Sequence, residues 1–264
     1  MKKNYLFYFI SLNLLGLAAC GNFTKSDLET NQIAQSISEK MAVNNQVKKN
    51  VSTAFIHDVG SRFGPIKKET VANALFFDDF FDKGQLEEIE TLKSVTIIRV
   101  IDDKRSDIRE IGYSNKLTDA QLNLLQSLEY ANNFLIKADY EKKNPETGVW
   151  EENESTPHLT IVPEKQARYM LGKEMLKAYL RVSSEEARVN VDPEKLQPAK
   201  LFFTVTTEGA VKNIRLDSPS GYPSLDEAVI QLMKDLPGTW EPAENAKGEM
   251  VDQELVVSFG SMGC

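Results

Sequence analysis

The chain has 264 residues, with 31 Lys and Arg against 39 Asp and Glu, and 41% of its residues are hydrophobic. This length suits one large domain or two small ones. The formal net charge of −8 argues against a nucleic-acid-binding protein and against electrostatic docking on anionic lipid headgroups. Two cysteines are too few for a disulfide framework.

The first nineteen residues have the pattern of an export signal. A basic start precedes an apolar stretch over residues 5–17, which is too short to span a bilayer as a mature helix. Leu17-Ala18-Ala19-Cys20 resembles the lipobox of bacterial lipoproteins, where small residues precede the cleaved bond and the next thiol carries diacylglycerol. We predict a signal peptide over residues 1–19 and lipidation of Cys20, which would leave a mature charge of −10. The alternative is an ordinary signal peptide with an incidental cysteine.

Three segments follow the signal peptide. Residues 20–52 are polar with widely spaced apolar side chains, and we interpret them as a tether. Residues 53–165 mix strand and helix patterns and predict an N-terminal α+β domain, in which Thr118 and Gln121 match a helix capping box. Residues 166–197 carry one helical face and then a charged stretch, which indicates a helical connector and a linker.

The last segment, residues 198–264, has the clearest pattern. Apolar residues alternate with others along its first strand, and Gly209 follows in a tight turn. The predicted order is a strand over 200–206, a returning strand over 211–216, a helix that begins at a capping box of Ser224 and Glu227, an extended segment that opens at Trp240, and a last strand over 253–259.

This segment resembles the C-terminal domain of TonB energy transducers. The resemblance covers about a quarter of the chain, and it depends on the whole ordered series of motifs. The matching residues are Phe203-Thr204-Val205, Glu208-Gly209-Ala210-Val211, Ser218 to Gly221 (which includes Ser220), Leu225-Asp226-Glu227-Ala228, Trp240-Glu241-Pro242-Ala243, Lys247-Gly248 and Val256 to Phe259.

The resemblance implies a protein-binding role. Domains of this family reach outer-membrane transporters and pair with their TonB box by strand addition, which requires an open sheet edge. The expected edge here is the last strand, namely Leu255, Val256, Val257, Ser258 and Phe259. The alternative is that this strand lies inside the sheet or is blocked by residues 260–264.

The chain also departs from the family. Energy transducers have an uncleaved membrane-spanning helix and a long Pro-rich spacer, and this sequence has neither. We therefore expect a non-catalytic lipoprotein that is anchored by several acyl chains, faces the periplasm and resides in the outer membrane of a Gram-negative bacterium. Its expected partner is an outer-membrane transporter, a TonB-box-like peptide or a second copy. The alternative is a structural lipoprotein whose domains pair with each other, without a role in transport.

An offset of 106 residues recurs along the chain. It relates Ile108-Arg109 to Ile214-Arg215, Thr118 to Ser224, and Phe134 to Trp240, whereas Leu159–Val162 matches 255–258 at an offset of 96. We therefore predict two small units of α+β class, each an antiparallel sheet with a packed helix, and a degenerate repeat over 94–163. The alternative is a chance recurrence of a common order of elements.

No motif for catalysis or for binding a cofactor or metal is present. The two histidines, His57 and His158, have no cysteine or second histidine at ligand spacing. Phosphate-binding loops, nucleophile elbows and zinc-protease motifs are absent from the sequence. Cys264 is a single thiol at the end of the chain, and we interpret it as a tail residue without a role.

Overall fold

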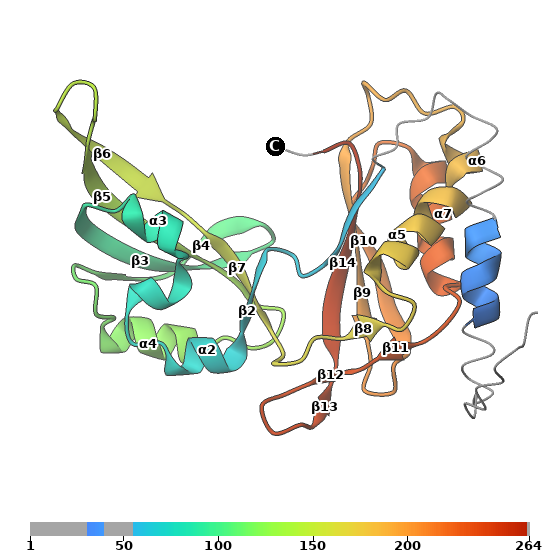
Figure 1. Cartoon of the computed structure of the whole chain (residues 1–264), viewed down its shortest axis with the longest axis horizontal. Helices are drawn as coiled ribbons and strands as arrows, with labels where there is room; N and C mark the ends of the chain where they lie inside the picture. The colour runs from blue at the N-terminus through green and yellow to red at the C-terminus, as the bar shows by residue number, and fades with distance from the viewer. Residues whose placement is uncertain (1–30, 40–54, 263–264) are drawn as a thin grey trace, which may run out of the picture.

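The computed structural model describes residues 31–39 and 55–262, which form a helix at 31–39 and two lobes (Figure 1). The signal peptide, Cys20 and Cys264 lie outside the described residues. We call residues 64–162 the N lobe. The C lobe consists of residues 55–60 together with 168–262. Within the described part of the chain, every helix is too short or too polar to cross a bilayer.

The C lobe is built on a four-stranded antiparallel sheet in the order β1-β14-β9-β10. Short two-stranded pairs, β8 with β11 and β12 with β13, extend it at one end. Its elements are β1 (Ile56–Gly60), β8 (Arg168–Tyr169), α5 (Lys173–Ser183), α6 (Glu185–Arg188), β9 (Pro198–Val205), β10 (Val211–Ser218), α7 (Pro223–Lys234), β11 (Trp240–Glu241), β12 (Ala243–Glu244), β13 (Met250–Val251) and β14 (Gln253–Gly260).

One face of this sheet packs against α5 and α7, which lie on the same side of it (Figure 1). The alternating residues Leu201, Phe203 and Val205 of β9 point into this core, as the sequence pattern predicts. Helix α5 contributes Leu176 and Leu180 to the same core. The helix expected within residues 166–197 is present as α5, but it packs into the core of the C lobe, whereas the sequence interpretation made it a connector between domains.

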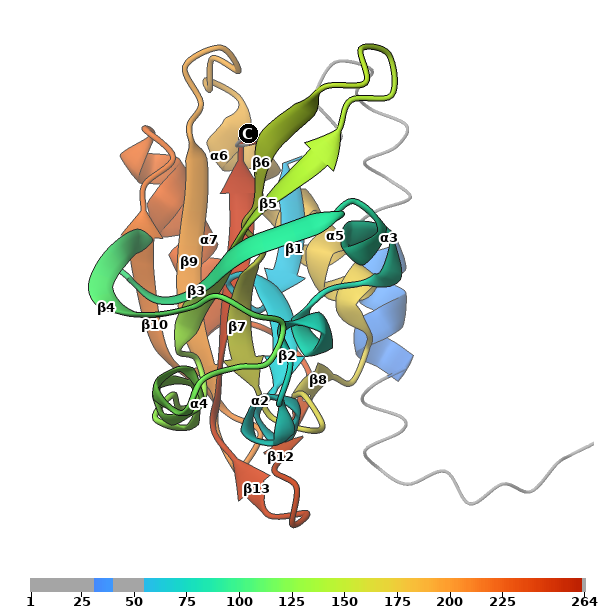
Figure 2. The ribbon, with the colours of Figure 1, turned by 90° about the vertical axis from the view of Figure 1, so that its left-hand side faces the viewer.

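The N lobe contains a second sheet, in the order β2-β7-β5-β3-β4, with β6 paired to the outer part of β5. Three helices and a 3-10 turn cover one face (Figure 2). Its elements are β2 (Gly64–Lys67), α2 (Lys68–Asn73), η1 (Phe77–Phe80), α3 (Lys83–Glu87), β3 (Thr91–Ile101), β4 (Lys104–Gly112), α4 (Asp119–Gln126), β5 (Asn133–Lys143), β6 (Trp150–Ser155) and β7 (His158–Val162).

The core of the N lobe lies between its sheet and these helices. Ile97, Phe134 and Ile136 of the sheet and Leu125 of α4 are fully or almost fully buried there. Helix α4 begins at the predicted capping box, in which Thr118 and Gln121 each accept a hydrogen bond from the other's backbone N–H. The predicted α+β class is thus confirmed for the chain.

The N lobe is an insertion in the C lobe. Strand β1 precedes the N lobe in sequence but pairs with β14, about 200 residues away. The chain leaves the C lobe after β1 and returns to it after β7, and β2 and β7 run parallel side by side. The predicted N-terminal domain over residues 53–165 included β1, but hydrogen bonding assigns this strand to the sheet of the C lobe, so the start of that domain was predicted too early.

The two lobes share only the first part of the proposed repeat. In both, two paired strands precede a helix: β3, β4 and α4 in one lobe, and β9, β10 and α7 in the other. After the helix the arrangements differ, because β5 pairs with β3 directly whereas β11 lies outside the main sheet. The place of β14 beside β9 is taken in the N lobe by β5 and not by Leu159–Val162. The repeat therefore stays a hypothesis for the first three elements alone.

Candidate protein-binding site

The predicted binding edge, Leu255 to Phe259, lies inside the sheet. Strand β14 pairs with β9 on one side and with β1 on the other. Val256, Val257 and Phe259 are each matched to a residue of β1. From Val256 to Phe259 the strand is therefore paired on both sides, and the prediction that it is an open edge was wrong for these residues.

The family-motif residues form two structural clusters. In the first, Gly209 turns the chain at φ +74°, and a Cβ there would lie 2.4 Å from the carbonyl oxygen of Trp240, with Pro242 alongside. In the second, the buried Asp226 accepts hydrogen bonds from the backbone N–H of Ser220 at 3.0 and 3.3 Å, next to the Gly221 turn. Both clusters position loops: Gly209 turns the chain between β9 and β10, and Ser220 and Gly221 follow β10.

Helix α7 begins two residues earlier than predicted. Pro223 is its first residue and Tyr222 its N-cap, and no side chain caps the helix. The predicted capping box of Ser224 and Glu227 was therefore wrong. The Asp226 carboxylate instead satisfies the buried N–H in the preceding loop.

The two open edges of the C-lobe sheet differ in their ability to accept a strand. Strand β10 carries register shifts after Lys212 and after Leu216, with Asn213 at φ +52° between them. Bulges and charged side chains such as Arg215 are features by which natural sheets block pairing at an edge. Strand β1, at the opposite edge, pairs with β14 alone among the described residues and has a single register shift, between Ile56 and Asp58, so Asp58 to Gly60 form the regular part of this edge.

A cleft of about 560 Å³ lies beside the open edge of β1. One wall is the segment from Asp58 to Pro65, which includes the end of β1 and the connection to the N lobe. The opposite wall is formed by residues 166–169 of the returning connection and by the start of α5. Five large apolar side chains line the cleft: Val59, Phe63, Leu176, Trp240 and Leu255.

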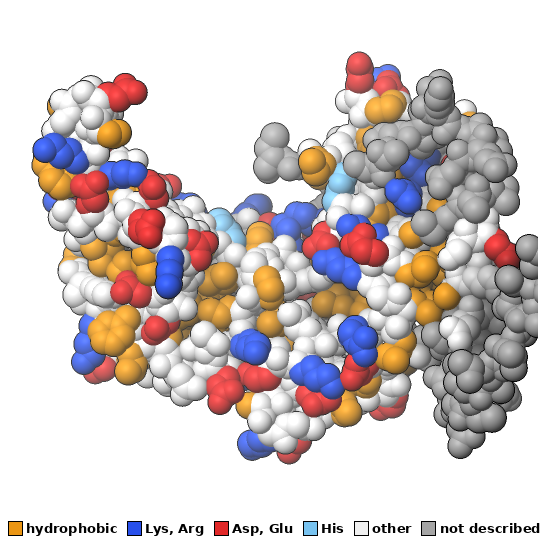
Figure 3. All heavy atoms as spheres, in the orientation of Figure 1, with side chains coloured by type: hydrophobic (Ala, Val, Ile, Leu, Met, Phe, Trp, Pro, Cys, Tyr) orange, Lys and Arg blue, Asp and Glu red, His pale blue; other side chains and the backbone are white. Residues whose placement is uncertain are grey.

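The charged groups at this cleft are paired with one another. Lys173 of α5 lies 2.5 Å from Asp58 of β1, and the Arg168 guanidinium lies 2.9 Å from Glu241. Figure 3 shows the same mixture on the surface, where acidic and basic side chains intermingle across the junction of the lobes. The described cleft therefore favours an uncharged occupant.

Tyr169 and Trp240 close the inner end of the cleft. Their rings are 5.5 Å apart, and the far side of Trp240 packs on Phe203 at 5.6 Å. Burial raises the pKa of Tyr169 to about 12, and its hydroxyl donates to the carbonyl oxygen of Pro237. The Trp240 side chain is 8% exposed, and its buried Nε1–H has no hydrogen-bond partner among the described residues.

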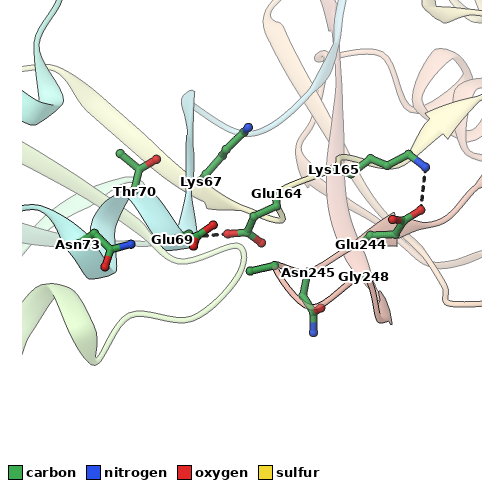
Figure 4. Close-up of a pocket in the computed structure, with 10 residues that line it drawn as sticks. Lys67, Glu69, Thr70, Asn73, Glu164, Lys165, Glu244, Asn245 and Gly248 are labelled. Atoms are coloured by element: carbon green, nitrogen blue, oxygen red, sulfur yellow. Dashed lines mark hydrogen bonds and ion pairs between the residues drawn. The ribbon is translucent and has the colours of Figure 1, made fainter.

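A second, shallower groove of about 640 Å³ lies between α2 and the loop that joins β12 to β13 (Figure 4). Lys165 pairs there with Glu244 at 2.7 Å and with Glu241 at 2.8 Å, and these carboxylates raise its pKa. Glu164, in the connection between the lobes, accepts the backbone N–H of Glu69 in the N lobe. These contacts join the two lobes across the groove, whereas Lys67, which also lines it, has no ion pair among the described residues.

Among residues 31–39 and 55–262, no cluster of three His, Cys, Asp or Glu side chains could hold a metal ion. His57 bonds to the carbonyl oxygen of Gly260, and His158 bonds to that of Thr156 and packs on Phe63.

Comparisons with protein-family models, with curated proteins and with solved structures find no match to this chain. The site is therefore interpreted from its own geometry and from the motif resemblance.

Proposed function

We propose that this protein is a lipid-anchored, non-catalytic binding module that holds an extended segment of a partner protein by strand addition. The protein would have the role expected of a TonB-like domain at the outer membrane, but the strand that accepts the partner would not be β14. The acceptor is β1, and the added strand would lie in the cleft between β1 and residues 166–169.

One observation carries this proposal: the open edge of β1 borders a cleft with apolar lining. An unpaired edge offers a row of N–H and C=O groups that fix the backbone of an added strand, while side-chain pockets select its sequence. β1 has five residues, so it offers few hydrogen bonds. Each contributes about 0.5–1.5 kcal/mol net, so a few of them supply about 2–4 kcal/mol, and the roughly 5–6 kcal/mol of a Kd near 100 µM also requires burial of apolar side chains in the cleft.

The test measures the anisotropy of fluorescently labelled TonB-box peptides titrated with the purified protein. Ala167, which lines the cleft, should be replaced by tryptophan, because its backbone N–H bonds to Gln253 and would be unaffected by a larger side chain. Ala167→Trp should weaken binding at least about tenfold by filling the cleft.

Ala246→Trp is the matched control, since Ala246 lines the second groove and lies far in sequence from β1. It should leave binding unchanged. Hydrogen exchange of the amides from Asp58 to Ser61 should slow in the complex. If peptides bind and these amides keep their free rates, β1 is not the acceptor; if nothing binds up to millimolar peptide, the proposed function is wrong.

The same edge could instead pair with β1 of a second copy, as the structural alternative requires. Equilibrium sedimentation separates the two roles. A dimer that Ala167→Trp dissociates would favour assembly, whereas a monomer that binds peptide favours recognition.

A further inference from the structure

The unpaired Trp240 indole identifies a side-chain subsite within the cleft. Buried polar groups in folded proteins are almost always hydrogen-bonded, and a buried donor without a partner costs about 1–3 kcal/mol. The Nε1–H of Trp240 is such a donor among the described residues. Its ring is held between Tyr169 and Phe203, so the donor cannot turn toward solvent without losing both contacts.

The surroundings of this donor are apolar. Leu176 of α5 and Leu255 of β14 line the same cleft and are both nearly fully buried. The Tyr169 hydroxyl is already used by Pro237, and the charges at the rim are paired. The cleft thus has apolar walls, and Trp240, which lines it, carries an enclosed hydrogen-bond donor that has no partner among the described residues.

We propose that Trp240 determines specificity in the cleft: its Nε1–H donates to a backbone carbonyl of an uncharged, extended peptide whose neighbouring apolar side chain packs on Leu176 and Leu255. This rests on the proposed function and adds the chemistry of the occupant. Since the Nε1 atom is enclosed in the free protein, the side chains around it must shift as the carbonyl arrives. Rotamer changes of this kind are common at interfaces.

The chain offers an internal control for this proposal, because it has only two tryptophans. Trp240 lies in the cleft, and Trp150 is half exposed on β6 of the N lobe. Each gives one indole N–H resonance in a ¹⁵N-correlation spectrum, and Trp150→Phe assigns them. The probes are N-acetyl-leucine-methylamide and an acetylated, amidated heptapeptide of alternating Thr and Leu.

The Trp240 indole proton should shift downfield with either probe while the Trp150 signal stays in place. Trp240→Phe keeps the aromatic packing and removes the donor, so heptapeptide affinity should fall about three- to tenfold. An N-acetyl-glutamate-methylamide probe should produce no shift at the same concentration.

The outcomes separate this inference from the proposed function. If the heptapeptide slows exchange at Asp58 to Ser61 but neither shifts the Trp240 signal nor loses affinity in Trp240→Phe, strand addition stands and the subsite is wrong. If the Trp240 proton exchanges magnetisation with a bound water in the free and loaded protein alike, water satisfies the donor and the subsite is also wrong. If no amide and no indole responds, both proposals fail.

Discussion

Asp226 has a different role from the one its neighbours in sequence suggest. The sequence predicts a capping box at Ser224 and Glu227, but the buried carboxylate of Asp226 satisfies the Ser220 N–H. Glu227 and Ser224 are exposed. The Asp226 carboxylate therefore holds the loop before α7 in place, and no side chain caps the helix itself.

Asp226→Ala should lower the free energy of unfolding by about 2 kcal/mol, because it leaves a buried N–H without an acceptor. Glu227→Ala should change it by less than about 0.5 kcal/mol. Urea denaturation of both variants measures this difference. A larger loss of stability in Glu227→Ala than in Asp226→Ala would indicate that Glu227 caps the helix after all.

Tyr169 makes stability depend on pH in the alkaline range. Burial raises its pKa from 10.0 to about 12 in the folded protein. Because the folded value is the higher one, the stabilisation is complete below pH 10 and is lost as pH rises from about 10 to 12. Tyr169→Phe should reduce the fall in melting temperature between pH 9 and 12. Tyr113→Phe, at an exposed tyrosine, should leave the wild-type slope.

At the scale of elements, α4 is tied to the sheet by its own cap. The Gln121 side chain accepts the Thr118 N–H at 2.9 Å and also donates Nε2 to the carbonyl oxygen of Val95 on β3 at 2.8 Å. Gln121 is 1% exposed. The residue thus joins the helix start to the central part of the N-lobe sheet.

Glutamate normally serves as well as glutamine at this position of a capping box. Here Gln121→Glu should destabilise the protein by about 2–4 kcal/mol, since it removes the donor to Val95 and buries a carboxylate against a carbonyl oxygen. The loss should shrink below pH 5, where the acid is protonated and can donate. A variant as stable as wild type at pH 7 would contradict the contact with Val95.

At the scale of the whole molecule, Asp103 links the lobes. It sits in the turn between β3 and β4, where it binds Arg62 of the connection and Lys200 of β9. Burial alone would raise the pKa of Asp103, but the hydrogen bonds and charge of Arg62, together with Lys200, outweigh it and hold that pKa below its usual value. Its stabilising contribution is therefore present above about pH 4 and is lost as pH falls through the lowered value.

Asp103→Asn should loosen the lobes at neutral pH. Spin labels at the exposed positions 146 and 227, in a chain with Cys20 and Cys264 replaced by serine, should report a broader inter-lobe distance distribution. Asp102→Asn is the control in the same turn, and it should leave the distribution unchanged. Equal broadening in both variants would assign the effect to the turn backbone.

Local patterns predicted the parts of the fold that depend on local contacts. The alternation of Leu201, Phe203 and Val205 and the cap at Thr118 were sufficient to place a strand and a helix. Strand β1 was ambiguous because the bulge between Ile56 and Asp58 interrupts its alternation. Its partner, β14, is about 200 residues away, so no neighbouring residue signals the pairing. The open edge and its cleft were therefore outside the reach of sequence patterns.

The C lobe is formed by two segments that are far apart in the sequence, and this affects how its sheet can assemble during folding. The sheet cannot be completed from one end of the polypeptide, because its outermost strand is synthesised before the N lobe and its neighbour after it. A fragment that starts at residue 166 would keep α5 and the rest of the C lobe but leave one side of β14 unpaired, and exposed strands of this kind self-associate. The isolated fragment should aggregate, whereas adding a synthetic segment with residues 55–61 should restore a monomer. Residues 55–61 would then protect β14 from pairing with other copies of the chain.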